Sequence, residues 1–162
     1  MNLASLSISD KFILFLATGF GSGFAPKAPG TVGTVVAILP FLLLQQLSEL
    51  SYLVIVVISA VLGIYLCNKA DELLQSHDNK AIVWDEFCGL WITLFMVPQG
   101  WQWLLLGFLL FRLFDILKPF PISLLDKHVK GGLGVMVDDL VAGLFAFLIL
   151  QSIVYFELLA FA

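Results

Sequence analysis

Long apolar runs separated by short polar segments dominate the sequence. They occupy residues 11–20, 31–47, 52–67, 87–97, 101–117 and 138–156. The last run would form a helix of roughly 28 Å, enough to cross a bilayer, whereas the first is too short to span one. The pattern predicts an all-α fold: a polytopic membrane bundle of about five membrane-embedded helices, preceded by an N-terminal interfacial helix. We expect residues 1–162 to form a single integral-membrane domain.

The turn signal Pro98-Gln99-Gly100 decides the topology, because it interrupts the apolar stretch 87–117. One continuous helix would place Asp85 and Asp115 on opposite sides of the membrane, whereas a short helical hairpin places them on the same side. The hairpin also puts every basic residue on one side, which the positive-inside rule favours and identifies as cytoplasmic. These residues are Lys11, Lys27, Lys69, Lys80, Arg112, Lys118, Lys127 and Lys130.

Composition supports the membrane assignment. Hydrophobic residues make up 60% of the chain and charged residues only 12%, where soluble domains carry about a quarter. The mean hydropathy is +1.04. Membrane lipids are therefore the expected surroundings, and nucleic acid is not an expected partner because no basic tail or RNA-binding motif is present. Cys67 and Cys88 lack metal-ligand spacing and are expected to be buried free thiols.

Five acids lie at the ends of the apolar runs: Asp85, Glu86, Asp115, Asp138 and Asp139. A carboxylate near hydrocarbon costs several kcal/mol unless it is compensated, so an acid there suggests a functional site. Acids that meet on one membrane face suit Mg²⁺, which prefers hard oxygen ligands. Taken singly, the pair 85–86 could be solvated interface charges. Asp138 and Asp139 could simply open the last helix, where the dipole favours negative charge.

A phosphate ligand is suggested by two further features. Arg112, Asp115 and Lys118 follow at i, i+3 and i+6 on one side of a helix that Pro119 ends. The segment 19–33 holds five glycines and two prolines, so its backbone can approach a ligand closely, although a plain turn fits the same composition. We expect phosphate to be bound by Gly30, Thr31, Gly33, Arg112 and Lys118.

Other phosphate chemistries are excluded by their missing motifs. Neither cysteine is followed by the C-x₅-R pattern of thiolate phosphatases, and the single arginine rules out the histidine-nucleophile lipid phosphatases. The motif of membrane CDP-alcohol transferases is also absent. A small cation transporter remains an alternative, but it would carry its acids at mid-span. A membrane phosphotransferase acting on another lipid headgroup is the second alternative.

Four motifs resemble the phosphatidylglycerophosphatase A family. They cover residues 21–33, 83–89, 111–122 and 131–143, in order. The resemblance implies a multi-pass, Mg²⁺-dependent phosphatase of the bacterial inner membrane that converts phosphatidylglycerophosphate to phosphatidylglycerol. Lys27 falls where the family pattern varies, so we assign it no catalytic role.

The expected mechanism places Mg²⁺ on several of the five acids, with the active site facing the cytoplasm. Attack by water and attack by a carboxylate, through an aspartyl-phosphate, both remain open. The residues expected to carry catalysis are Asp85, Glu86, Arg112, Asp115, Lys118 and Asp139.

Overall fold

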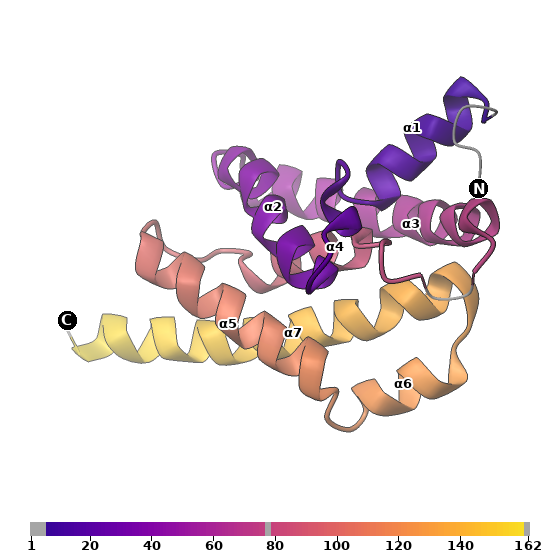
Figure 1. Ribbon diagram of the computed structural model, residues 1–162. Coiled ribbons are helices and arrows are strands. Elements are labelled where there is room, and N and C mark those ends of the chain that lie inside the picture. The colour runs from indigo at the N-terminus through magenta and orange to yellow at the C-terminus, as the bar shows by residue number, and fades with distance from the viewer. Residues whose placement is uncertain (1–5, 77–78, 161–162) are drawn as a thin grey trace.

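The computed structural model describes residues 6–76 and 79–160, with side chains through residue 156, and these residues form helices and no strands (Figure 1). The all-α prediction is confirmed. In chain order the elements are α1 (Ile8–Ala17), η2 (Ser22–Phe24), α2 (Pro29–Leu44), α3 (Glu49–Leu74), α4 (Trp84–Thr93), α5 (Trp101–Leu117), α6 (Ile122–His128) and α7 (Gly131–Ala160).

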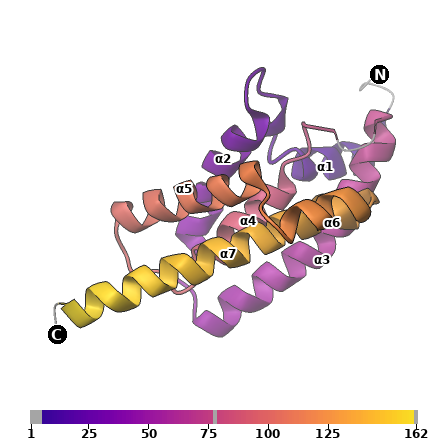
Figure 2. The ribbon, with the colours of Figure 1, turned by 90° about the horizontal axis from the view of Figure 1, so that it is seen from below.

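Helix α7 is the longest element and packs against α3, α4, α5 and α6. In Figure 1 it runs across the molecule to the C-terminus while α5 crosses it obliquely. Figure 1 shows α3 and α6 on opposite sides of its N-terminal part, and in the view from below α6 lies in front of that part (Figure 2). Helix α7 therefore contacts every helix from α3 to α6.

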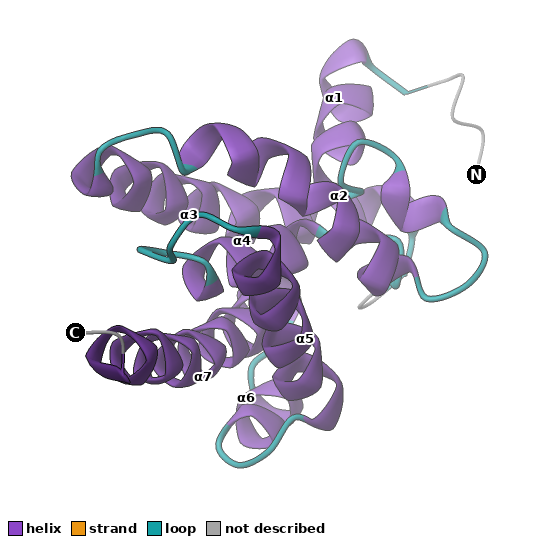
Figure 3. Ribbon diagram, turned by 90° about the vertical axis from the view of Figure 1, so that its left-hand side faces the viewer, coloured by secondary structure: helices purple, strands orange, loops and turns teal. Residues whose placement is uncertain are grey.

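Helix α4 forms the centre of the bundle, although it has only ten residues (Figure 3). It contacts α2, α3, α5 and α7, and Phe87, Cys88 and Leu90 are fully buried. Two indole N–H groups tie it to its neighbours: Trp84 donates to the Ser59 carbonyl of α3 at 3.1 Å and Trp91 to the Ala37 carbonyl of α2 at 2.9 Å. Protein, rather than lipid, therefore surrounds α4.

The predicted break at residues 98–100 is present, because α4 ends at Thr93 and α5 begins at Trp101. Proline lacks a backbone donor and does not continue a helix, which explains the separation. The first arm of the hairpin is shorter than predicted. Cys67 and Cys88 are both free and buried, as expected.

Three predicted boundaries are wrong. Helix α3 continues to Leu74 instead of ending at residue 67, helped by an ion pair one turn apart between Lys69 and Glu72 at 2.8 Å. The polar segment between the predicted runs 101–117 and 138–156 contains α6, and α7 starts at Gly131 rather than at residue 138. Gly132 lies so close to the α3 backbone at Ile64 that a side chain would collide there. Gly132 therefore allows α7 to approach α3 closely.

Helix length supports only part of the membrane prediction. In the described part of the chain, Glu49–Leu74 and Gly131–Phe156 are long and apolar enough to cross a membrane, and Pro29–Leu44 is a shorter apolar helix. The N-terminal helix is short, as predicted, but starts at Ile8, where the Ser7 hydroxyl accepts a hydrogen bond from the Asp10 N–H at 3.1 Å.

Candidate active site

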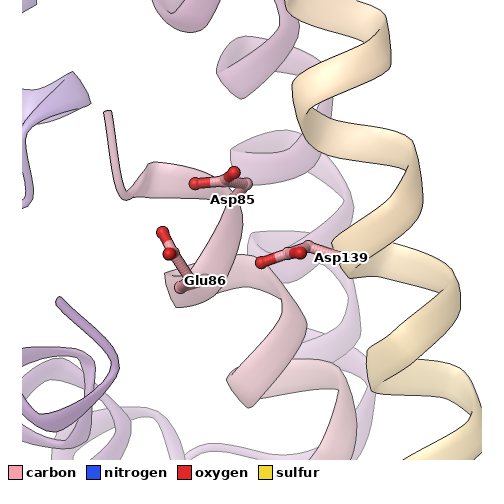
Figure 4. A group of neighbouring side chains, drawn as sticks. All are labelled: Asp85, Glu86 and Asp139. Atoms are coloured by element: carbon pink, nitrogen blue, oxygen red, sulfur yellow. The ribbon is translucent and has the colours of Figure 1, made fainter. Parts of the chain in front are cut away.

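Three carboxylates from two helices converge near the start of α4. Asp85 and Glu86 lie in its first turn, and Asp139 faces them from α7 (Figure 4). One oxygen of each carboxylate lies within 4.8 Å of the others. We call Asp85, Glu86 and Asp139 the acid trio. It brings together residues that are 53 positions apart in the chain.

A close glycine contact between α4 and α7 positions the acid trio. A side chain on Gly143 would collide with the backbone of Gly89, and one on Gly89 would meet the Asp139 carbonyl. Thr93 lies across this contact, its hydroxyl 2.9 Å from the Gly89 carbonyl and 3.2 Å from the Gly143 carbonyl. Asp85 and Asp139 each precede their glycine by four residues, about one helical turn. The backbone contact one turn away therefore sets the spacing of the acids.

Arg112 stands beside the acid trio and is held from two sides. Its Nη1 lies 2.5 Å from Asp115 Oδ2 and donates to Thr34 Oγ1 at 3.3 Å. The same nitrogen is 3.8 Å from Glu86 Oε1. The prediction that Arg112 and Asp115 lie on the same side of one helix is thus confirmed. Thr34, fully buried in α2, was not predicted; its hydroxyl also donates to the Gly30 carbonyl at 2.8 Å.

Lys118 is part of a second group of charges. It caps α5 and lies 2.6 Å from Asp126 of α6 and 2.5 Å from Asp138 of α7. Burial disfavours the charged ammonium, but the hydrogen bonds to Asp126 and Asp138 and their negative charges outweigh this effect and raise the pKa of Lys118. The lysine therefore stays charged throughout the physiological pH range.

The acid trio, by contrast, has buried oxygens without hydrogen-bond partners among the described residues. They are Asp85 Oδ1, Glu86 Oε2 and Asp139 Oδ2; Asp138 Oδ1 is a fourth such atom. Leaving a buried acceptor unpaired costs about 1–3 kcal/mol, and more if it is charged. A divalent cation with hard-oxygen preference would satisfy three such atoms at once. The donor set therefore fits Mg²⁺.

All five predicted acids line one cavity of about 840 Å³. Arg112, Lys118 and the start of α2 at Gly30 line it as well. Asp71 of α3 and Asp126 of α6 also line it, and neither was predicted. Asp71 is buried and its Oδ1 accepts from the Asn79 N–H at 3.2 Å. Helices α2 to α7 therefore all contribute to the cavity, whereas no residue of α1 or η2 lines it.

Two details of the structure differ from what the sequence suggested for the site. Gly33 packs against the Val83 side chain, where it permits helix contact, and neither Gly33 nor Thr31 lines the cavity. Asp138 and Asp139 do not open a helix, because α7 begins seven residues before Asp138. Their negative charge is compensated by side chains or a ligand rather than by the dipole of the first turn. Gly30 does lie at the site, with Glu86 Oε1 directly against it.

Comparison with known proteins gives the relationship. A sequence model described as Phosphatidylglycerophosphatase A matches residues 15–154. The chain belongs to this family. The phosphatidylglycerophosphatase A of Escherichia coli K12 is 44% identical over 142 residues, which cover 87% of this chain and 80% of that protein. That of Haemophilus influenzae Rd is 44% identical over 148 residues, covering 90% and 91%.

A third relative, from Bacteroides thetaiotaomicron, is named "Putative phosphatidylinositol-3-phosphatase". It is 39% identical over 145 residues, covering 85% of this chain and 90% of that protein. No solved structure matches. The predicted family and enzyme class, a phosphatase acting on phosphate monoesters, are confirmed. Bacterial relatives and two helices of membrane-crossing length indicate a membrane protein.

Proposed function

We propose that the protein is a Mg²⁺-dependent phosphatase that removes the terminal phosphate of phosphatidylglycerophosphate to leave phosphatidylglycerol. Family membership supports the reaction and the substrate. The observation that carries the chemistry is the acid trio, with its unpartnered oxygens, beside the Arg112 guanidinium in one cavity. Phosphoryl transfer requires carboxylate oxygens that bind a metal ion, next to a positively charged side chain that binds the phosphate.

Asp85, Glu86 and Asp139 would hold the metal. When bound, Mg²⁺ supplies positive charge that polarises a phosphoryl oxygen and a water nearby. Asp115 and Asp138 were also predicted as ligands, but each faces a basic side chain, Arg112 and Lys118 respectively. We therefore assign these two acids to orienting the basic residues rather than to the direct coordination of the metal.

Arg112 would bind the oxygens of the terminal phosphate. Its planar fork suits bidentate contact with phosphate, and Asp115 and Thr34 restrict its rotation. Its Nε is buried without a hydrogen-bond partner among the described residues, so a donor remains for a ligand. The backbone N–H of Gly30, in the first turn of α2, would add a neutral donor for the same oxygens.

Hydrolysis breaks the phosphorus–oxygen bond to the glycerol of the headgroup. One carboxylate of the cavity would take a proton from the attacking water, and a proton must reach the departing glycerol oxygen. In the alternative route a carboxylate attacks phosphorus itself and is released by water in a second step. Labelled phosphate that stays on the protein after acid quench would identify the second route.

We further propose that the cavity faces the cytoplasm in the bacterial inner membrane and that α2, α3, the α4–α5 hairpin and α7 are all embedded. The turns after α2 and α4 and the end of α7 contain no lysine or arginine. They lie together on the left of Figure 1, away from the start of α4. All basic residues therefore belong to the cavity end or to α1, as the positive-inside rule requires of a cytoplasmic end. Exposed apolar residues of α3 such as Leu53, Val57 and Val61 would contact lipid.

Phosphate release by the detergent-purified protein tests this function. The substrates are phosphatidylglycerophosphate, phosphatidate and phosphatidylinositol 3-phosphate, the last suggested by the name of the third relative. We expect the fastest release from phosphatidylglycerophosphate with Mg²⁺ and none with chelator. Undiminished turnover in the presence of chelator would show that the reaction does not depend on Mg²⁺. Faster phosphate release from phosphatidate or from phosphatidylinositol 3-phosphate would show that the proposed substrate is wrong.

A further inference from the structure

Four basic side chains line the cavity, and they divide into two pairs. Arg112 and Lys118 both form ion pairs within the site. Lys80 and Lys130 are exposed and have no acidic partner among the described residues. The first pair is partly neutralised by the protein, whereas the second pair leaves two positive charges for a ligand.

The two free lysines come from different loops that are anchored to the same part of α3. Lys80 follows Asn79, whose backbone N–H donates to Asp71 of α3 at 3.2 Å. Lys130 precedes the first turn of α7, where the Gly132 N–H donates to Asn68 of α3 at 3.4 Å. Asn68 and Asp71 are one helical turn apart. The two loops therefore flank adjacent points of one helix and present both lysines to the same cavity.

The lipid proposed above carries two phosphates, and the acid trio with Arg112 accounts for only the terminal one. The other is a phosphodiester with one negative charge that links the headgroup to the diacylglycerol. At about 840 Å³ the cavity is as large as the sites that enclose drug-sized ligands, so it can hold more than one phosphate. A buried or half-buried diester needs a cation or donors to replace its water.

We propose that Lys80 and Lys130 bind this internal phosphodiester and so determine that the enzyme prefers lipids with two phosphates over phosphatidate. The inference rests on the proposed function. Attraction to anionic lipid at the membrane surface is the competing role for exposed lysines. That role would apply equally to Lys127, which is also exposed and lies only three residues from Lys130. Lys127 does not line the cavity, so it separates attraction to the surface from binding in the cavity.

The test compares Lys80→Gln, Lys130→Gln and the matched control Lys127→Gln in uncharged detergent micelles. The two cavity variants should each raise the KM for phosphatidylglycerophosphate about tenfold while kcat stays within about twofold. Phosphatidate, added as a competitor, has only a monoester, so its inhibition constant should not change. The control should resemble the unaltered enzyme in both measurements. Lys80→Arg and Lys130→Arg keep the charge and should restore most of the affinity.

A second measurement uses the deacylated headgroup, glycerophosphoglycerophosphate, which keeps both phosphates but cannot enter a micelle. The same loss of affinity there supports direct contact with the diester. Loss with the lipid alone would indicate a surface effect and overturn the proposal, as would an equal loss for phosphatidate or for Lys127→Gln. If the unaltered enzyme releases no phosphate from phosphatidylglycerophosphate, the proposed function itself fails, which is a distinct result.

Discussion

The acid trio and the charges around Lys118 both bring carboxylates of different helices together, but they differ in how the negative charge is balanced. Lys118 has a carboxylate on each side, at 2.5 and 2.6 Å, so the protein balances its charge, and Asp138 Oδ1 is the one buried oxygen of this group without a hydrogen-bond partner among the described residues. Asp85, Glu86 and Asp139 place three carboxylates together and leave an oxygen of each without a hydrogen-bond partner among the described residues. A cluster that the protein does not balance needs a ligand, whereas a balanced one serves to hold helices in place.

The largest effect should come from neutralising the acid trio. Asp85→Asn and Asp139→Asn each remove a charge with little change in volume, so turnover should fall by about 10³-fold, or about 4 kcal/mol of transition-state stabilisation. Thermal unfolding gives the second readout. Mg²⁺ should stabilise the unaltered protein and not the variants, because a ligand stabilises only the state that binds it. Normal turnover in both variants would make these acids structural.

Moving the acids apart without changing them should have the next largest effect. Gly143→Ala introduces a methyl group against the Gly89 backbone, which cannot rotate away, so α7 must shift from α4. We expect turnover to fall by about 10²-fold and stability by about 1–3 kcal/mol. Gly107→Ala is the control, since the methyl group there meets the flexible Leu94 side chain. Equal losses in both variants would show that the α4–α7 contact has no special role.

Substitutions of Arg112 test whether its ion pair with Asp115, near the acid trio, has a structural or a catalytic role. Arg112→Lys keeps the charge but loses the planar fork, and turnover should fall by about tenfold or more. The double variant Arg112→Gln with Asp115→Asn removes both charges of the 2.5 Å pair. We expect no recovery relative to the single variants. Recovery of most of the activity would show that the ion pair between Arg112 and Asp115 has a structural role, like the ion pairs of Lys118.

The smallest effect is expected in the balanced group. Asp126→Asn leaves Asp138 to hold Lys118, so turnover should fall by less than about threefold. The raised pKa of Lys118 adds a pH criterion. Its contribution to stability is complete below the unfolded pKa of about 10.4 and is lost only as pH rises through the higher folded value. Stability curves from pH 6 to 9 should therefore not differ in slope between this variant and the unaltered protein.

The sequence predicted the hairpin and the convergence of the five acids because both follow from local signals. A proline–glycine break separates two apolar runs, and Arg112 and Asp115 are one turn apart on any helix. It predicted Asp138 and Asp139 alike as metal ligands. Neighbouring residues on a helix point about 100° apart, so one faces Lys118 and the other faces α4, and only tertiary packing fixes that rotation.

Other parts of the site were not predicted because their meaning depends on distant residues. Thr34 stands in an apolar run and resembles any helix threonine until Arg112, 78 positions later, approaches its hydroxyl. Gly30 and Gly33 belong to the same motif, yet Val83 occupies the space beside Gly33 and leaves only Gly30 at the cavity. Asp126 lies on α6, a helix that the polar segment between runs 101–117 and 138–156 did not predict.

The burial of α4 has a consequence for how the chain enters a bilayer. Ten helical residues extend about 15 Å, half the thickness of the hydrocarbon layer, so lipid alone cannot hold this helix across the membrane. In the embedded arrangement proposed above, its insertion follows that of the longer helices α3 and α7, which pack around it. Substitutions at Phe87 or Leu90 should therefore behave like mutations in the core of a water-soluble protein. They would leave a partly assembled chain in the membrane rather than one that fails to reach it.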